Sequence, residues 1–331
     1  MYKKFFGLTR SPFEISPDPY FLFPTSRHNE ALASIAHGVI RRKGFMVLTG
    51  EVGTGKTLMV RCLLELLRNR GVASANIFNP RLRPNEFLHY VIGDLGMNSD
   101  NAENKGTLLL QLYNYLIGRQ KINQTTVLIV DEAQNMDVEL LEEIRLLTNL
   151  ETAQQKLIQI VLVGQPELDS KLDSPQLRQL KQRVTVRCAL EPLQEVETRS
   201  YIWQRLKRAG ANFQAVLVFP PPTVASIYNY SQGIPRLINT ICENALITAY
   251  ARQSRTITED IVHEVARDLR LRVVSHPLTP TNGNGLTESQ QILAKSLLDF
   301  IKVLDKAARG SFAPPPTNDS DSVEIAEAKV V

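Results

Sequence analysis

The segment from Gly50 to Thr57 has the residue types and spacing needed to hold phosphate. It reads Gly50-Glu51-Val52-Gly53-Thr54-Gly55-Lys56-Thr57, which matches the pattern G-x-x-x-x-G-K-T. An apolar run precedes it and a helical pattern follows it, and the motif requires this context. Its glycines let backbone N–H groups turn towards phosphate oxygens, and the helix N-terminus adds partial positive charge. We expect Lys56 to bind the β- and γ-phosphates of ATP and the Thr57 hydroxyl to ligate Mg²⁺.

Two acidic residues follow a second apolar run. The aliphatic stretch 127–130 leads directly into Asp131 and Glu132. At the carboxyl end of a strand, these side chains would lie at the sheet edge where α/β proteins bind their ligands. Such a run has little specificity by itself, but behind a phosphate loop it supplies the other half of a phosphoryl-transfer site. We expect Asp131 to hold Mg²⁺ and Glu132 to activate the attacking water, which predicts a Mg²⁺-dependent ATP hydrolase.

Gln165 and Arg236 are two further candidates for contact with the γ-phosphate. Gln165 follows the apolar run 158–163, and we expect it to orient water or phosphate. Arg236 follows a bend and Pro235, which are typical of a helix start, and we expect it to close over the phosphates. Each has a structural alternative: Gln165 as a turn residue that caps its strand, and Arg236 as an arginine in solvent.

Arg183 is a candidate for catalysis between subunits. It directly precedes the fifth apolar run, in a basic segment that also holds Arg178. A cation there would face away from its own site, and we expect Arg183, in preference to Arg178, to be an arginine finger for a neighbouring subunit. The alternative is a basic helix face in solvent.

Five short apolar runs indicate the sheet that positions these side chains. Each is β-branched or aliphatic on both faces, as in strands covered by helices on either side. Helical segments separate them, which implies crossover connections and a parallel sheet in a three-layer α/β fold. The runs are Phe45–Thr49, Val72–Phe78, Thr126–Val130, Ile158–Val163 and Val184–Cys188.

The pattern changes on both sides of this α/β core. The first 25 residues are rich in proline and aromatics. The prolines favour an extended lead-in, and we expect its aromatic side chains to pack on the core. After residue 191 the strand pattern stops and helical patterns follow, so we expect a small all-α lid. The expected order is a lead-in at 1–26, the ATPase core at 27–191, the lid at 192–272, a linker at 273–285, an amphipathic helix at 286–309 and a disordered tail at 310–331.

Composition excludes several classes of protein. The chain has 331 residues, 43% hydrophobic and 22% charged, which is typical of a globular protein of about two domains and not of a collagen-like, disordered or disulfide-scaffold chain. Its net charge of +4 is too small to indicate nucleic acid by itself. The three cysteines lack metal or redox spacing and are expected to be reduced. No run approaches the ~18 apolar residues of a membrane span, and we expect a cytoplasmic protein.

Together the motifs resemble those of the AAA+ ATPases. The match runs through the phosphate loop, Asp131-Glu132, the turn at Gln165, the arginine before the fifth strand and Gly233-Ile234-Pro235-Arg236. The start of the chain is more specific and resembles the general secretion pathway protein A family, with relatives encoded at pilus or exosortase loci. Its motifs are Phe6-Gly7-Leu8, Ser11-Pro12-Phe13, Pro17-Asp18-Pro19 and His28-x-Glu30-Ala31-Leu32, and the resemblance covers about residues 1–270.

The resemblance implies a P-loop NTPase sheet of order 5-1-4-3-2, a helical lid and nucleotide at the domain junction. The lead-in and the segment around His28 would border the adenine pocket. It also implies a homo-oligomer with ATP sites between subunits, a protein partner in an export apparatus, and attachment to the inner membrane through that partner. Longer family members continue into a transmembrane helix and a peptidoglycan-binding domain, so we expect this chain to correspond to the motor half.

Two other functions stay open at this point. The first is a DNA-binding ATPase that resembles transposition helper proteins. Basic clusters at 41–43, 68–70 and 267–272 would contact phosphates, although the sequence contains no evident recognition helix. The second is a scaffold that does not hydrolyse ATP and acts through the apolar stripe at 293–304, which could equally pack on the lid.

Overall fold

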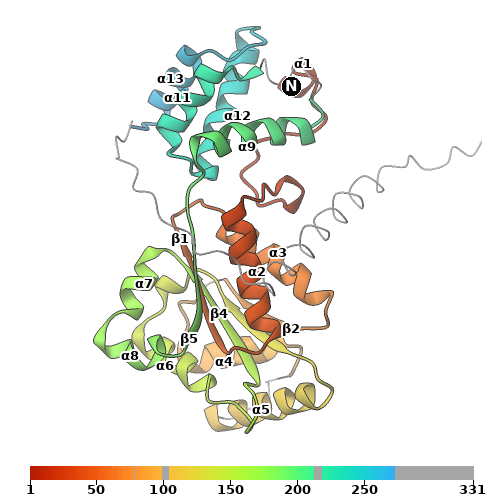
Figure 1. Cartoon of the computed structure of the whole chain (residues 1–331), viewed down its shortest axis with the longest axis vertical. Helices are drawn as coiled ribbons and strands as arrows, with labels where there is room; N and C mark the ends of the chain where they lie inside the picture. Colours follow the sequence, from red (N-terminus) through yellow and green to blue (C-terminus); the bar gives the residue numbers. More distant parts are fainter. Residues whose placement is uncertain (79, 99–103, 212–217, 273–331) are drawn as a thin grey trace, which may run out of the picture.

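A parallel five-stranded sheet forms the centre of the larger part of the molecule (Figure 1). The computed structural model describes residues 1–78, 80–98, 104–211 and 218–272. The strands are β1 (Phe45–Gly50), β2 (Ala73–Ile77), β3 (Thr126–Val130), β4 (Ile158–Gly164) and β5 (Val184–Leu190). Their order is β2-β3-β4-β1-β5 and every pairing is parallel, which confirms both the five predicted strands and the order 5-1-4-3-2.

Helices cover both faces of this sheet because successive strand residues point to opposite sides. Met46 and Leu48 of β1 lie in one apolar core with α2 and α3, whereas Phe45 and Val47 lie in a second core with the helices of the other face. The first face carries α2 (Ser26–Ile40) and α3 (Lys56–Arg68). The other carries α4 (Pro84–Asp94), α5 (Lys105–Lys121), η2 (Ala133–Asn135), α6 (Val138–Leu147), α7 (Pro166–Leu172), η3 (Pro175–Leu177) and α8 (Arg178–Lys181). The result is the expected three-layer α/β fold.

A smaller helical part follows β5 and has an apolar core of its own. Its helices are α9 (Glu195–Arg208), α11 (Pro221–Ser231), α12 (Pro235–Ala251) and α13 (Glu259–Asp268). Ile238, Ile241 and Leu246 of α12 are completely buried and meet Ile202 of α9 and Val262 of α13. Figure 1 shows this part stacked on the carboxyl end of the strands.

The N-terminal lead-in packs differently from our expectation. Leu8, Phe13 and Phe21 are buried in the core of the helical part, not in the cores of the sheet. The Tyr20 hydroxyl donates to the Arg208 carbonyl at the end of α9 (3.0 Å). The physical reason is that α2 to α8 already cover both faces of the sheet, so exposed apolar surface remained on the helical part. The segment is also less irregular than expected, since it contains α1 (Tyr2–Phe5) and η1 (Pro19–Phe21).

The expected linker, amphipathic helix and tail, residues 273–331, lie outside the described residues. The three cysteines are free, and burial raises the pKa of Cys62 and Cys188 to about 11. Among the described residues, no helix combines the length and the apolar character needed to cross a bilayer.

Candidate nucleotide site

The phosphate loop connects β1 to α3 and takes its shape from two glycines. Gly53 and Gly55 have φ of +84° and +102°, values that glycine adopts without a Cβ penalty. At Gly53 a Cβ would also lie 2.8 Å from the Cβ of Arg236. Gly55 is the N-cap of α3 and supplies no side-chain acceptor to the first N–H groups of the helix. These donors and the positive end of the helix are therefore left for an anion.

Lys56 and Thr57 begin α3 at the entrance to a cavity. The Lys56 ammonium donates to the carbonyls of Gly50 (2.7 Å) and Glu51 (3.0 Å), and the side chain is 6% exposed. Burial lowers the pKa of Lys56, while the nearby carboxylates of Glu132 and Asp131 oppose that shift. The lysine thus carries a positive charge next to two acids and is held by neutral acceptors that an anion could replace.

Asp131 lies at the end of β3 and faces α3. Its carboxylate accepts from the Thr57 hydroxyl (3.1 Å) and from the Glu132 N–H (2.9 Å). The side chain is buried, and this burial raises the pKa of Asp131 despite both hydrogen bonds. Hydroxyl and carboxylate oxygens are the ligands that Mg²⁺ prefers, so the Thr57–Asp131 pair fits the expected metal.

Glu132 is turned towards the cavity by an unusual backbone conformation. Its φ of +53° and ψ of +34° are left-handed, which is uncommon outside glycine. Its carboxylate Oε2 accepts from the Gln134 amide (2.6 Å) and the Gln165 amide (3.3 Å). The Gln134 Oε1 in turn accepts from the Gln165 backbone N–H (3.1 Å). Two amides from different elements therefore fix the position of one carboxylate.

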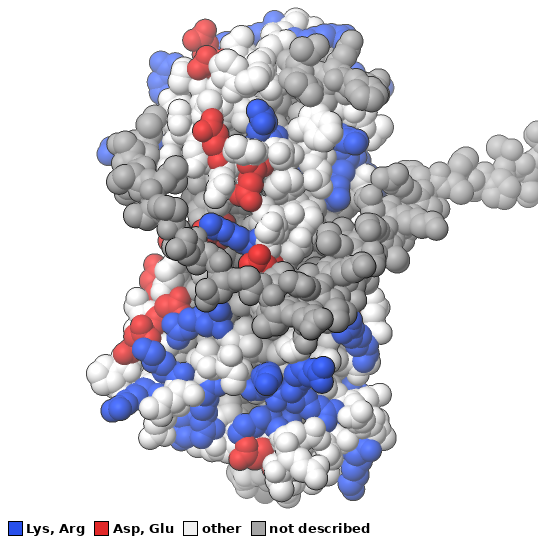
Figure 2. Space-filling model, in the orientation of Figure 1, with Lys and Arg blue, Asp and Glu red and all other residues white. Residues whose placement is uncertain are grey.

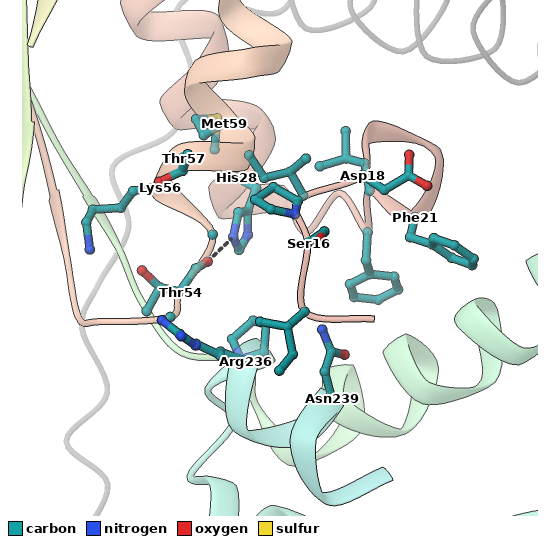
Figure 3. Close-up of a pocket in the computed structure, with 18 of the residues that line it drawn as sticks. Ser16, Asp18, Phe21, His28, Thr54, Lys56, Thr57, Met59, Arg236 and Asn239 are labelled. Carbon is teal, nitrogen blue, oxygen red and sulfur yellow. Dashed lines mark hydrogen bonds between the residues drawn. The ribbon is translucent and has the colours of Figure 1, made fainter. Parts of the chain in front are cut away.

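A cavity of about 450 Å³ extends from the phosphate loop between the lead-in and the helical part. Lys56, Thr57, Glu132, Gln165 and Arg236 all line it together with residues 52–55 of the phosphate loop, so the structure brings these predicted residues to one cavity. Figure 3 shows Arg236 and Asn239 projecting from α12 towards the phosphate loop and the lead-in. The backbone N–H of Arg236 donates to the Gly53 carbonyl (3.3 Å).

The lead-in and His28 border the same cavity. His28 Nδ1 lies 2.6 Å from the Thr25 hydroxyl and Nε2 lies 3.4 Å from the Thr54 carbonyl. Burial lowers the pKa of His28, although the Thr54 carbonyl opposes the shift. Asp18 and Phe21 lie on the opposite wall (Figure 3). The end of the cavity away from the phosphate loop is therefore built largely from the start of the chain.

Arg183 does not reach this cavity. Its guanidinium donates to Asn149 Oδ1 (2.6 Å), to the Arg145 carbonyl (3.3 Å) and to the Thr148 hydroxyl, all at the end of α6. It precedes β5, whose 7 residues span about 20 Å, so it lies a strand length from its own phosphate loop. Arg178 is exposed, and no hydrogen bond or ion pair of its side chain occurs among the described residues.

Three residues in and around the cavity were not anticipated. Gln134 positions Glu132, and the Lys171 ammonium donates to the Gln134 carbonyl (2.6 Å), which fixes the turn. Arg205 lines the cavity but is only 5% exposed; it donates to the Tyr201 hydroxyl (3.0 Å) and stacks on Phe21. Nothing in the spacing of these residues marks them, because the contacts of Gln134 with Gln165, of Lys171 with Gln134 and of Arg205 with Phe21 join segments distant in sequence.

Comparisons with known proteins agree with this geometry. A family model described as "AAA domain" matches residues 40–172. General secretion pathway protein A of Aeromonas hydrophila is 43% identical over 257 residues, which is 78% of this chain and 46% of that protein. The chain belongs to the AAA+ family and is a relative of general secretion pathway protein A. This AAA+ protein spans a little under half the length of that relative.

Solved structures support the AAA+ fold independently. Cdc6p of Pyrobaculum aerophilum has a TM-score of 0.60 at 19% identity, with 77% of this chain and 70% of that chain covered. The ORC2 protein of Aeropyrum pernix, in ADPNP-ADP complexes, has a TM-score of 0.59 at 18% identity, with 80% and 73% covered. At this level of identity the similarity concerns the fold alone.

Proposed function

We propose that this AAA+ protein hydrolyses ATP in the cavity between its α/β and helical parts. The observation that carries the proposal is the position of Glu132, a carboxylate held by Gln134 and Gln165 in the cavity that Lys56 and Thr57 also line. A protein that only bound nucleotide would not need a fixed acid beside the place expected for the γ-phosphate.

Each residue then has a role that its environment supports. The N–H groups of α3 and the Lys56 ammonium bind the phosphates, and Glu132 takes a proton from the water that attacks the γ-phosphorus, so that ADP leaves. Thr57 and Asp131 are the residues that would hold Mg²⁺, which supplies positive charge to the phosphates when bound. Gln165 orients water or phosphate, and Arg236 approaches the phosphates from the helical part.

The test is steady-state phosphate release by Glu132→Gln. Glutamine keeps the size and an acceptor oxygen of the side chain but cannot take a proton, so turnover should fall at least about 100-fold. Nucleotide affinity, measured with a fluorescent ATP analogue, should stay within a few-fold of the unmodified chain.

Glu139→Gln is the matched control, because Glu139 is exposed on α6 and lies outside the cavity. Its turnover should equal that of the unmodified protein. Equal turnover in both variants would contradict a role for Glu132, and the absence of any phosphate release by the unmodified chain would contradict the proposed activity itself.

We further propose that hydrolysis drives a conformational change in the assembly of a secretion, pilus or polysaccharide export system. The relationship to general secretion pathway protein A supports this role. A homo-oligomer with ATP sites between subunits is part of the same proposal, with Arg183 or Arg178 acting on the neighbouring site.

A further inference from the structure

A second polar cavity lies at the other edge of the sheet. All strands are parallel, so the segments that precede β1, β2, β3 and β4 meet at the edge opposite the phosphate loop. The cavity, of about 520 Å³, is lined by residues from each of these four segments. Its polar side chains include Arg41 and Arg42 before β1, Arg70 before β2, Asn123 before β3, and Gln154 and Gln155 before β4.

Arg42 fixes the wall of this cavity. Its guanidinium donates to the Thr125 hydroxyl (3.2 Å), to Asn123 Oδ1 (3.1 Å) and to Gln155 Oε1. These three acceptors belong to two other connecting segments, so one side chain joins three loops. Arg42 also has a left-handed φ of +54°. Each of its three guanidinium nitrogens donates within the protein, and its contribution is to hold the cavity in shape.

Arg41 and Arg70 supply positive charge to the cavity, and no described residue pairs with their guanidinium groups. Both are exposed, and neither side chain has a hydrogen bond or an ion pair with any residue that the structure describes. Among the residues that the structure describes, no aspartate or glutamate lines the cavity. Burial lowers the pKa of the neighbouring His37, and the charges of Arg41 and Lys43 lower it further. The guanidinium groups of Arg41 and Arg70 therefore present positive charge that no described carboxylate pairs with.

The types of side chain that line the cavity indicate which kind of anion it fits. Amide side chains of Asn123, Gln124, Gln154 and Gln155 stand beside the two free guanidinium groups. Arginine with asparagine and glutamine is the set that contacts phosphate and sugar oxygens in nucleic-acid complexes. A lipid surface would be met better by a convex face with exposed apolar side chains, whereas the apolar residues here, Ile40 and Val72, are half-buried. Figure 2 shows Lys and Arg gathered over the lower end of the α/β part, where the strands begin in Figure 1.

We propose that this cavity binds the phosphodiester backbone of duplex DNA through Arg41 and Arg70. The contact is to phosphates, so binding should depend little on sequence and steeply on salt. The site is separate from the nucleotide cavity and lies at the far edge of the sheet. The proposal therefore does not depend on ATP hydrolysis.

The test is the anisotropy of a short labelled duplex titrated with protein at several salt concentrations. Arg41→Glu/Arg70→Glu should weaken binding at least about 10-fold at low salt and reduce the slope of log K against log salt by about 2, since two phosphate contacts are lost. The control is Lys4→Glu/Arg199→Glu, which reverses two exposed charges on the helical part, outside the basic clusters at 41–43, 68–70 and 267–272. It should stay within about twofold of the unmodified chain, because the same net charge change then lies away from the cavity.

Three results would overturn the proposal: no duplex binding by the unmodified chain at low salt, an equal loss in both double variants, or binding only to vesicles that contain phosphatidylglycerol. Phosphate release without DNA should be unchanged in both double variants. A chain that binds the duplex as expected but releases no phosphate would contradict the proposed hydrolysis and leave the DNA site supported.

Discussion

Asp131 is stabilised poorly in the absence of a cation. It is 4% exposed, and the loss of water around it raises its pKa above the ordinary 3.8. The folded state therefore binds the proton of the Asp131 carboxyl group more tightly than the unfolded state does. As a result, the free energy of unfolding falls as the pH rises from 3.8 through the raised pKa. Above the raised pKa the folded protein holds a buried carboxylate, and a bound metal would offset the cost of burying that charge.

Asp131→Asn should therefore stabilise the ligand-free protein. An amide can still accept from the Glu132 N–H and donate to the Thr57 hydroxyl, while the buried charge is gone. We expect the free energy of unfolding to rise by about 0.5–2 kcal/mol, the range of substitutions that trade function for stability. Thermal unfolding in a chelator measures it, and the gain should be larger at alkaline than at acidic pH.

Asp137→Asn is the control for this measurement. Asp137 is an exposed N-cap of α6, and asparagine caps a helix equally well, so its effect should be within about 0.5 kcal/mol. A loss of stability in Asp131→Asn would show that the carboxylate is favourable in the folded protein and would contradict this account of its burial.

Residues fixed by a local motif could be predicted from the sequence, and those fixed by tertiary contacts could not. Lys56, Thr57, Asp131 and Glu132 follow strands whose apolar pattern is clear, and parallel strands bring their ends to one edge. Gln134 matters because its side-chain amide donates to the Glu132 carboxylate and accepts from the Gln165 backbone N–H, which lies 31 residues further along the chain. No spacing rule in the sequence predicts the contact with Gln165.

At the scale of the elements, Gly233 joins the helical part to the end of the sheet. Its φ is +72°, and a Cβ there would lie 1.8 Å from the Leu193 carbonyl oxygen. The Leu193 N–H donates to the Gly233 carbonyl (2.9 Å). This close backbone approach sets where α12 begins, and hence where Arg236 and Asn239 meet the phosphate loop.

Gly233→Ala should separate these two segments. We expect a loss of about 2 kcal/mol or more, from the left-handed backbone and the clash with Leu193, and a weaker nucleotide affinity because α12 is displaced. Denaturant unfolding and nucleotide titration measure the two effects.

Gly118→Ala in α5 is the matched control, since a Cβ there meets nothing within 4 Å. It should be neutral or stabilise by up to about 1 kcal/mol. Similar unfolding curves and similar nucleotide affinities for the two variants would contradict the role given to Gly233.

The arrangement of the elements also explains why the expected packing of the lead-in on the α/β core was wrong. Strands and helices were predictable because their apolar periodicity is local. The aromatics of the lead-in indicated burial, but composition does not say against which surface. Phe13, 0% exposed, stacks edge-on against Phe219 of the helical part, 206 positions along the chain.

For the whole molecule, Arg183 lies too far from the phosphate loop of its own chain to reach a nucleotide bound there. Arg183 lies at the start of β5 and the phosphate loop at the far end of the neighbouring β1. An arginine finger from this region therefore requires an oligomer in which one subunit's arginine meets the next subunit's nucleotide.

Mixing two inactive variants tests this arrangement. Lys56→Ala lacks a phosphate site and Arg178→Ala/Arg183→Ala lacks the arginines, and each should be nearly inactive alone. An equal mixture should regain about a quarter of the full turnover, because about half of the subunits keep the site and half of their neighbours keep the arginines. Thermal unfolding of each variant checks that loss of the Arg183 contacts with α6 does not itself unfold the chain. If the folded variants stay inactive when mixed, catalysis between subunits is contradicted.

The most direct test of the central claim is a single-turnover measurement with protein in excess over ATP labelled at the γ-phosphate. The unmodified chain should convert all bound label to free phosphate. Glu132→Gln should retain intact ATP, bound and recoverable on denaturation. Cleavage at the same rate in both proteins, or intact ATP in both, would contradict the assignment of Glu132 as the residue that activates water.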